Sequence, residues 1–91
     1  MMTKLSKAYK RKFVELRAVI NAWELIPDAP EDEFDAIDHL LLSQLYKGSD
    51  AFKIAKALKF ELNHNYGFSV ADDAVANMVT EVIAWWNSLK E

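Results

Sequence analysis

The chain has 91 residues, a hydrophobic fraction of 52% and a formal net charge of −3 at pH 7. It has no cysteine, which excludes disulfides, thiol catalysis and thiolate metal sites. Because a secreted domain of this size usually needs disulfides or a metal for stability, we expect a cytoplasmic protein with a single domain over residues 1–91. No apolar run approaches the roughly 20 residues that a membrane span requires.

Charge is unevenly distributed along the chain. The first 17 residues hold six basic residues and one acidic residue, whereas the remainder holds five basic and thirteen acidic residues. The basic segment is short and the rest is acidic, so the composition disfavours nucleic-acid binding and favours a basic protein partner. A nucleic-acid binder would use Lys4, Lys7 and Arg11, which share one helix face.

The first predicted helix covers about residues 4–25. Its apolar residues recur every three or four positions, as on one face of an α-helix: Leu5, Tyr9, Phe13, Leu16, Ile20 and Trp23. Thr3 is expected to be the N-cap. Pro27 disfavours helical backbone at the residue before it, so the helix is expected to end near Glu24 or Leu25.

The second predicted helix covers about residues 30–47. Pro30 suits the first helical position, because the N–H there would have no partner within the helix. The acidic residues that follow it would occupy the first turn, where the helix dipole favours negative charge. Gly48 is expected to end the helix. The expected buried residues are Phe34, Ile37, Leu41 and Leu45.

The third predicted helix covers about residues 50–65, and the fourth about 70–89. The third is expected to start at Ser49 or Asp50, and the fourth at Ser69 through a capping box. Apolar residues in the third lie on one line at Ala51, Ala55, Leu58 and Leu62. No segment alternates with period two, so we predict an all-α fold: a compact four-helix bundle or array, up-down and antiparallel by default.

Three short passages of the sequence resemble the YugE-like family of small uncharacterised all-helical bacterial proteins. They are Ile20–Glu24, Ala29–Phe34 and the aromatic-glycine step at Tyr66–Phe68, and the resemblance covers roughly residues 17–70. The resemblance implies a compact all-helical fold without an assigned activity. It therefore bears on the fold and leaves the function open.

A dense acidic run is the candidate functional site. Five carboxylates lie within eight residues: Glu31, Asp32, Glu33, Asp35 and Asp38. Clustered charge accelerates encounter with a partner of opposite sign, so the run predicts a docking surface for a basic protein. The alternative interpretation is a solvated helix start. Tyr46, Phe52 and Trp85 are expected to anchor the partner, because exposed aromatic residues are typical interface anchors.

These features predict a non-enzymatic protein–protein interaction module, with no catalytic residue, cofactor or metal. The specific hypothesis is an acidic immunity or antitoxin-type protein that neutralises a basic toxin domain. One alternative is a structural or regulatory homo-oligomer joined through the aromatic-rich fourth helix. Another is a metalloprotein using Glu61 and His64, whose spacing is that of a ligand motif in di-iron helix bundles.

Overall fold

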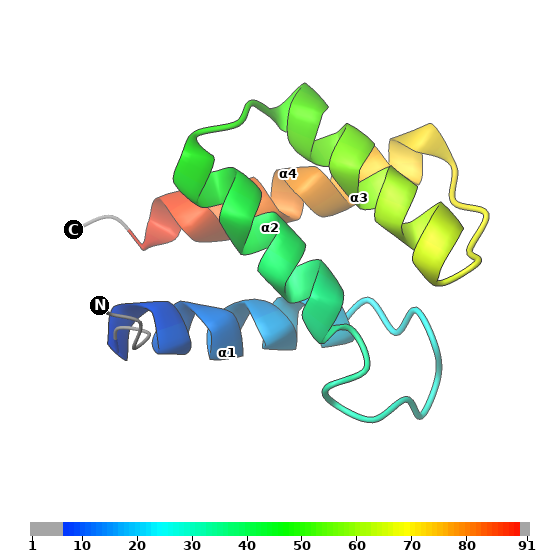
Figure 1. Ribbon diagram of the computed structural model, residues 1–91, viewed down its shortest axis with the longest axis horizontal. Coiled ribbons are helices and arrows are strands. Elements are labelled where there is room, and N and C mark those ends of the chain that lie inside the picture. Colours follow the sequence, from blue (N-terminus) through cyan, green and yellow to red (C-terminus); the bar gives the residue numbers. More distant parts are fainter. Residues whose placement is uncertain (1–6, 90–91) are drawn as a thin grey trace. The chain divides into compact units, whose positions relative to one another are not determined.

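The computed structural model describes residues 7–89, which form four α-helices and contain no strand (Figure 1). The helices are α1 (Lys7–Asn21), α2 (Asp35–Lys47), α3 (Ala51–Asn65) and α4 (Asp72–Ser88). The prediction of an all-α protein built from four helices is therefore confirmed. Thr3, the predicted N-cap of the first helix, lies outside the described residues, as do Lys4 and Leu5.

The chain divides into two compact units, Met1–His39 and Leu40–Glu91, and the division falls within α2. We call them the N-terminal unit and the C-terminal unit. The single domain expected from chain length stays a prediction. The predicted buried line of the second helix is confirmed, since Phe34, Ile37, Leu41 and Leu45 are all buried. The other buried apolar residues are Leu16, Ile20, Leu42, Ile54, Leu58, Leu62, Val75, Val79 and Val82.

Helix α1 ends at Asn21, earlier than the predicted end near Glu24 or Leu25. At its end the hydrogen-bond pattern tightens. The Ala22 N–H still donates to the Ala18 carbonyl four residues back, but the Glu24 N–H donates to the Asn21 carbonyl three residues back. Glu24 then adopts a left-handed backbone with φ of 53°. A left-handed residue cannot continue a right-handed helix, so the chain leaves the helix before Pro27 acts on Ile26.

Helix α2 begins at Asp35, so the prediction that it begins at Pro30 was wrong. In a helix from Pro30, the Asp35 N–H would donate to the Glu31 carbonyl. That carbonyl instead accepts from Asn21 Nδ2 at 3.1 Å, and the Asp35 N–H donates to the Asp32 carbonyl at 3.2 Å. The first α-type bond runs from Asp38 N–H to the Phe34 carbonyl. A contact with α1 therefore holds residues 30–34 in tight turns.

Both ends of the α2–α3 connection behave as the sequence predicts. Gly48 has φ of 78°, and the Ser49 N–H bonds back to the Gln44 carbonyl, the arrangement of a Schellman motif. Asp50 is the N-cap of α3, and its Oδ1 accepts a 2.8 Å hydrogen bond from the Lys53 N–H. The loop is short because the backbone groups at both helix ends find hydrogen-bond partners within a few residues.

Helix α4 begins at Asp72, and the predicted capping box at Ser69 was wrong. The N-cap is Ala71, which has no side-chain cap, and Asp72 and Asp73 occupy the first turn. There the carboxylates meet the positive end of the helix dipole. Helix α4 packs against α3 in the opposite chain direction (Figure 1): Lys59, just past the middle of α3, pairs with Asp72 at the start of α4. These two helices have the antiparallel order that short connections favour.

Candidate interaction surfaces

Arg17 on α1 engages two carboxylates of the acidic run within the N-terminal unit. Its Nε and Nη2 donate to the two carboxylate oxygens of Asp35 at 3.0 and 2.7 Å, and its Nη1 donates to Glu31 Oε2 at 3.4 Å. The Arg17 and Asp35 side chains are only 26% and 31% exposed. The hydrogen bond with Asp35 raises the pKa of Arg17. A pair joined by two hydrogen bonds fixes the relative orientation of both side chains, so Asp35 stabilises the fold.

Asp38 is fully buried, one helical turn after Asp35. Neither of its carboxylate oxygens has a hydrogen-bond partner among the described residues. Burial and, to a smaller extent, the nearby charge of Asp35 raise the pKa of Asp38 to about 7, against the opposing effect of Arg17. A buried side chain presents no charge to a docking partner, so the prediction that Asp38 belongs to an exposed acidic surface was wrong. Its position on the buried face beside Ile37 explains this.

The exposed part of the acidic run is therefore smaller than the sequence predicts. Glu31, Asp32 and Glu33 lie on the surface, and Glu31 is already paired with Arg17. Sequence reasoning assigned Arg17 to the basic N-terminal segment and missed its role. The available signal was its place on α1: Arg17 lies directly after buried Leu16, so it borders the apolar face instead of pointing away from it.

The predicted aromatic anchors differ in how they are placed within the C-terminal unit. Tyr46 is 50% exposed, and its ring meets the Trp86 ring edge-on with centroids 5.1 Å apart. Trp85 is half-buried and lies against Trp86, with centroids 6.1 Å apart. Phe52, in contrast, is 73% exposed. Of the three, Phe52 therefore offers the most apolar surface that the fold leaves uncovered.

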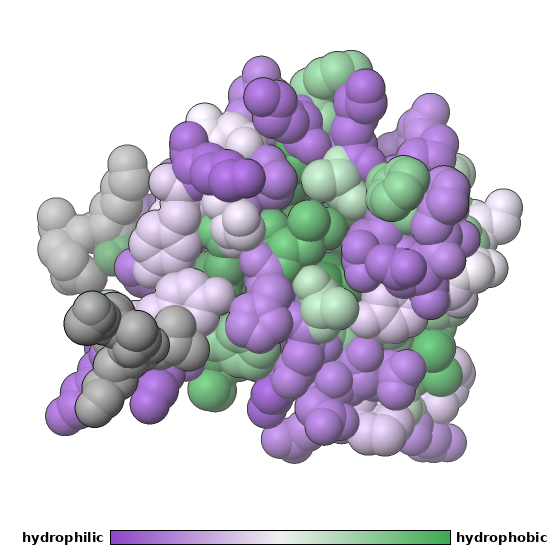
Figure 2. Space-filling view, viewed as in Figure 1, coloured by the Kyte–Doolittle hydropathy of each residue, from purple (hydrophilic) through white to green (hydrophobic). Residues whose placement is uncertain are grey.

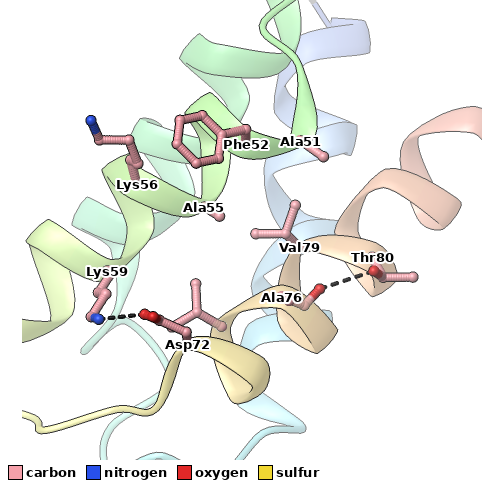
Figure 3. A pocket seen from close by; sticks show the side chains of 10 residues that line it. Ala51, Phe52, Ala55, Lys56, Lys59, Asp72, Ala76, Val79 and Thr80 are labelled. Atoms are coloured by element: carbon pink, nitrogen blue, oxygen red, sulfur yellow. Dashed lines mark hydrogen bonds and ion pairs between the residues drawn. The ribbon is translucent and has the colours of Figure 1, made fainter.

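Phe52 stands at the rim of a groove between α3 and α4, with a volume of about 580 Å³ (Figure 3). In Figure 3, Ala51 and Ala55 of α3 face the space in front of Val79 and Ala76 of α4. The groove exists because these alanines are too short to fill the space beside the buried Val75 and Val79. Ala51 and Ala55 belong to the apolar line predicted for the third helix, yet they line the groove while Leu58 and Leu62 are buried.

Lysines border the groove on the α3 side. Lys56 and Lys59 line it, and the Lys56 ammonium lies 5.6 Å from the centre of the Phe52 ring. Lys59 is paired with Asp72, and this pair crosses one end of the groove (Figure 3). Lys53 and Lys56 also border a second depression on the other side of Phe52. The Phe52 ring therefore stands between two hollows, both bordered by positive charge.

The molecular surface carries both hydrophilic and apolar side chains. In the face drawn in Figure 2, hydrophilic side chains cover most of the surface, with smaller apolar areas between them. Phe60, another residue of α3, is 60% exposed, but its ring stacks on His64 with centroids 4.1 Å apart. His64 Nδ1 also donates to the Phe60 carbonyl. Phe60 thus provides an internal comparison for Phe52: a similar exposed ring on the same helix that borders no groove described above.

Within residues 7–89, no group of three or more histidine, aspartate or glutamate side chains is placed to hold a metal ion. In the same range, none of the helices combines the length and the apolar character that crossing a bilayer requires. Comparison of the chain with protein-family models, with curated proteins and with solved structures finds no match. The resemblance to the YugE-like family and the cytoplasmic location stay predictions.

Proposed function

We propose that this protein is a non-enzymatic protein-binding module and that Phe52 is its principal anchor. One observation carries the proposal: a Phe side chain 73% exposed at the rim of a groove floored by apolar residues. Complete burial of a Phe side chain is worth roughly 1.5–3 kcal/mol, and the fold leaves most of this unrealised. A partner that covers Phe52 and fills the groove gains that energy, as at the hot spots of protein interfaces.

The surroundings of Phe52 strengthen the proposal. A single exposed apolar side chain is common in any protein and carries little meaning. Here the ring is continuous with exposed Ala51 and Ala76 and with half-buried Ala55. A contiguous apolar patch with a polar rim is the usual form of an interaction site.

The test is a comparison of Phe52→Ala with Phe60→Ala in affinity capture from cells of the source organism. Both variants remove an exposed ring from α3, and circular dichroism establishes that both keep the fold. We expect wild-type protein and Phe60→Ala to enrich the same protein in quantitative mass spectrometry, and Phe52→Ala to lose it. Equal enrichment by all three proteins, or enrichment of no protein by any of them, contradicts the proposal.

A basic partner, such as a toxin domain, is a separate proposal that depends on Glu31, Asp32 and Glu33. These three residues are exposed and form the part of the acidic run that a partner can reach. Replacing them with Gln, Asn and Gln should slow association with the captured partner and reduce its salt dependence. An unchanged association rate at low salt removes the steering role.

The homo-oligomer joined through α4 is less well supported than the binding module. Trp86 of α4 packs against Tyr46 and Trp85 within the C-terminal unit, so these rings already have apolar neighbours. Analytical ultracentrifugation decides this alternative: a monomer at high protein concentration removes it.

A further inference from the structure

The groove between α3 and α4 has the dimensions of a site for one face of a helix. Its lining residues run from Ala51 to Lys59 on α3 and from Asp72 to Thr80 on α4. Nine helical residues span about 12 Å at 1.5 Å per residue. Apolar residues at positions i, i+4 and i+7 of a docked helix span about 10 Å, so three such anchors fit along the groove.

The floor of the groove suits a helix because its side chains are small. Ala51 and Ala55 on one wall and Ala76 on the other allow close approach, while Val75 and Val79 provide an apolar base. The anchors of a docked helix would project into the space that these alanines leave. The Phe52 ring on the rim would then cover the side of the docked helix.

The charged residues around the groove indicate which kind of partner helix would bind there. Lys56 lines the groove beside Phe52, and exposed Lys53 borders the second depression on the other side of the ring. Asp50 borders that depression too, where its Oδ1 caps α3 by accepting from the Lys53 N–H. The opposite wall at Ala76 and Thr80 is neutral, and the Thr80 hydroxyl donates to the Ala76 carbonyl. The single acid that lines the groove, Asp72, is paired with Lys59. Lysines therefore outnumber the acidic residues around Phe52 and the groove, and complementarity favours carboxylates on the partner.

We propose that the α3–α4 groove binds an acidic amphipathic helix of a partner protein, with apolar residues in the groove and carboxylates facing Lys53 and Lys56. This inference rests on the proposed function and adds the chemistry of the partner to it. It differs from the basic partner that the sequence predicts, because the acidic run belongs to the N-terminal unit and the groove to the C-terminal unit.

The test uses three fluorescein-labelled synthetic peptides on the full-length protein. The acidic peptide has Leu at i, i+4 and i+7 and Glu on the flanking positions. Its basic twin has Lys in place of every Glu, and its anchorless twin has Gln in place of every Leu. Fluorescence anisotropy at low and high salt measures binding. We expect the acidic peptide to bind with a Kd below about 1 mM and at least about tenfold more tightly than either twin at low salt.

Paired variants locate the binding. Lys53→Glu/Lys56→Glu should weaken the acidic peptide at least about tenfold at low salt, whereas Lys7→Glu/Lys10→Glu makes the same change in net charge on α1 and should alter the affinity little. Ala76→Gln should block the groove, whereas Asn77→Gln on the same helix lies outside the lining residues and should not. All four variants change exposed side chains, so the fold is expected to persist.

Three outcomes overturn the inference: no binding of the acidic peptide up to about 1 mM, equal or tighter binding of the basic twin, or insensitivity to both groove variants. If decanoate binds, in a way that Ala76→Gln abolishes, while the acidic peptide does not bind, the groove takes a small amphiphile and the inference also fails. The proposed function has an independent readout. Phe52-dependent capture of a protein whose binding segment is basic or uncharged leaves the function standing and removes only the acidic helix.

Discussion

In the N-terminal unit several charged residues are paired or buried, whereas in the C-terminal unit Lys53 and Lys56 are exposed around an apolar groove. In the N-terminal unit, Arg17 holds Asp35 and Glu31, and Asp38 is buried. In the C-terminal unit, Lys53 and Lys56 lie beside exposed Phe52. The first arrangement uses charge to fix the turns before α2, and the second leaves charge and apolar surface exposed side by side. Dense charge in a sequence can therefore belong to the fold, as at Arg17 and Asp35, and is not by itself a sign of an interaction site.

The largest effect should come from Asp38 and depend on pH. The folded protein holds the Asp38 proton up to a pKa of about 7, whereas the unfolded chain releases it near pH 4. The folded state thus binds more protons between these values, and the stability due to neutral Asp38 is lost as pH rises through about 7. The difference in pKa corresponds to a loss of up to roughly 4 kcal/mol between pH 4 and pH 8.

Asp38→Asn removes this titration, so its free energy of unfolding should lack that decline. Chemical denaturation of both proteins at several pH values measures the difference. Asp32→Asn is the matched control, because it removes an exposed carboxylate of the same acidic run and should keep the wild-type decline. Parallel pH curves for wild type and Asp38→Asn would contradict the buried, raised-pKa carboxylate.

Arg17→Ala should have the second-largest effect and lower the free energy of unfolding measured by chemical denaturation. It removes two charge-assisted hydrogen bonds from Asp35 and leaves that half-buried carboxylate without its cation. Because Arg17 also lowers the pKa of Asp38, the pH-dependent loss of stability should extend to higher pH in this variant. Arg11→Ala, an exposed residue on the same helix, should change stability by less than about 0.5 kcal/mol. Equal effects of the two substitutions would show that the Arg17 pairs do not hold this unit.

Gly48→Ala should cost about 1 kcal/mol in the C-terminal unit. Gly48 has φ of 78°, where a side chain clashes with the backbone, although no neighbouring atom lies within 4 Å of the added methyl group. The cost therefore comes from the backbone alone. Thermal unfolding measures it, and Ser43→Ala, which changes an exposed residue of α2, serves as the control. A variant as stable as wild type would mean that the turn adopts another conformation.

Phe52→Ala should have the smallest effect on stability, less than about 0.5 kcal/mol, because the ring is 73% exposed. Its effect on partner binding should be large by comparison. This separation between stability and binding is the reverse of that expected for Asp38 and Arg17. A loss of several kcal/mol in Phe52→Ala would instead assign the ring to the packing of the C-terminal unit.

The helices could be predicted from the sequence where local signals act alone. The buried line from Phe34 to Leu45, the stop at Gly48 and the N-cap at Asp50 depend on periodicity or on residues within one turn. The start of α2 could not be predicted in this way, because it depends on the hydrogen bond from Asn21 Nδ2 to the Glu31 carbonyl, ten positions away in the sequence. The start of α4 shows a related limit: the capping pattern at Ser69 is present, but the helix begins three residues later without it.

The candidate site was predictable only in part, for a similar reason. Phe52 was identified from aromatic density, but the groove beside it depends on how α3 packs on α4. Ala51 and Ala55 look like core residues by spacing, and only the packing of the two helices leaves them at the groove. The role of Arg17 depends on its contacts with Glu31 and Asp35, 14 and 18 positions away, which a local sequence pattern does not indicate.

The most direct test of the account is a two-dimensional ¹H–¹⁵N NMR titration of the full-length protein with the acidic peptide. We predict that the amide signals that shift come from the groove-lining stretches 51–59 and 72–80, while those of residues 31–38 stay in place. Shifts concentrated in residues 31–38, with the groove signals unchanged, would contradict the claim that the C-terminal unit carries the interaction surface.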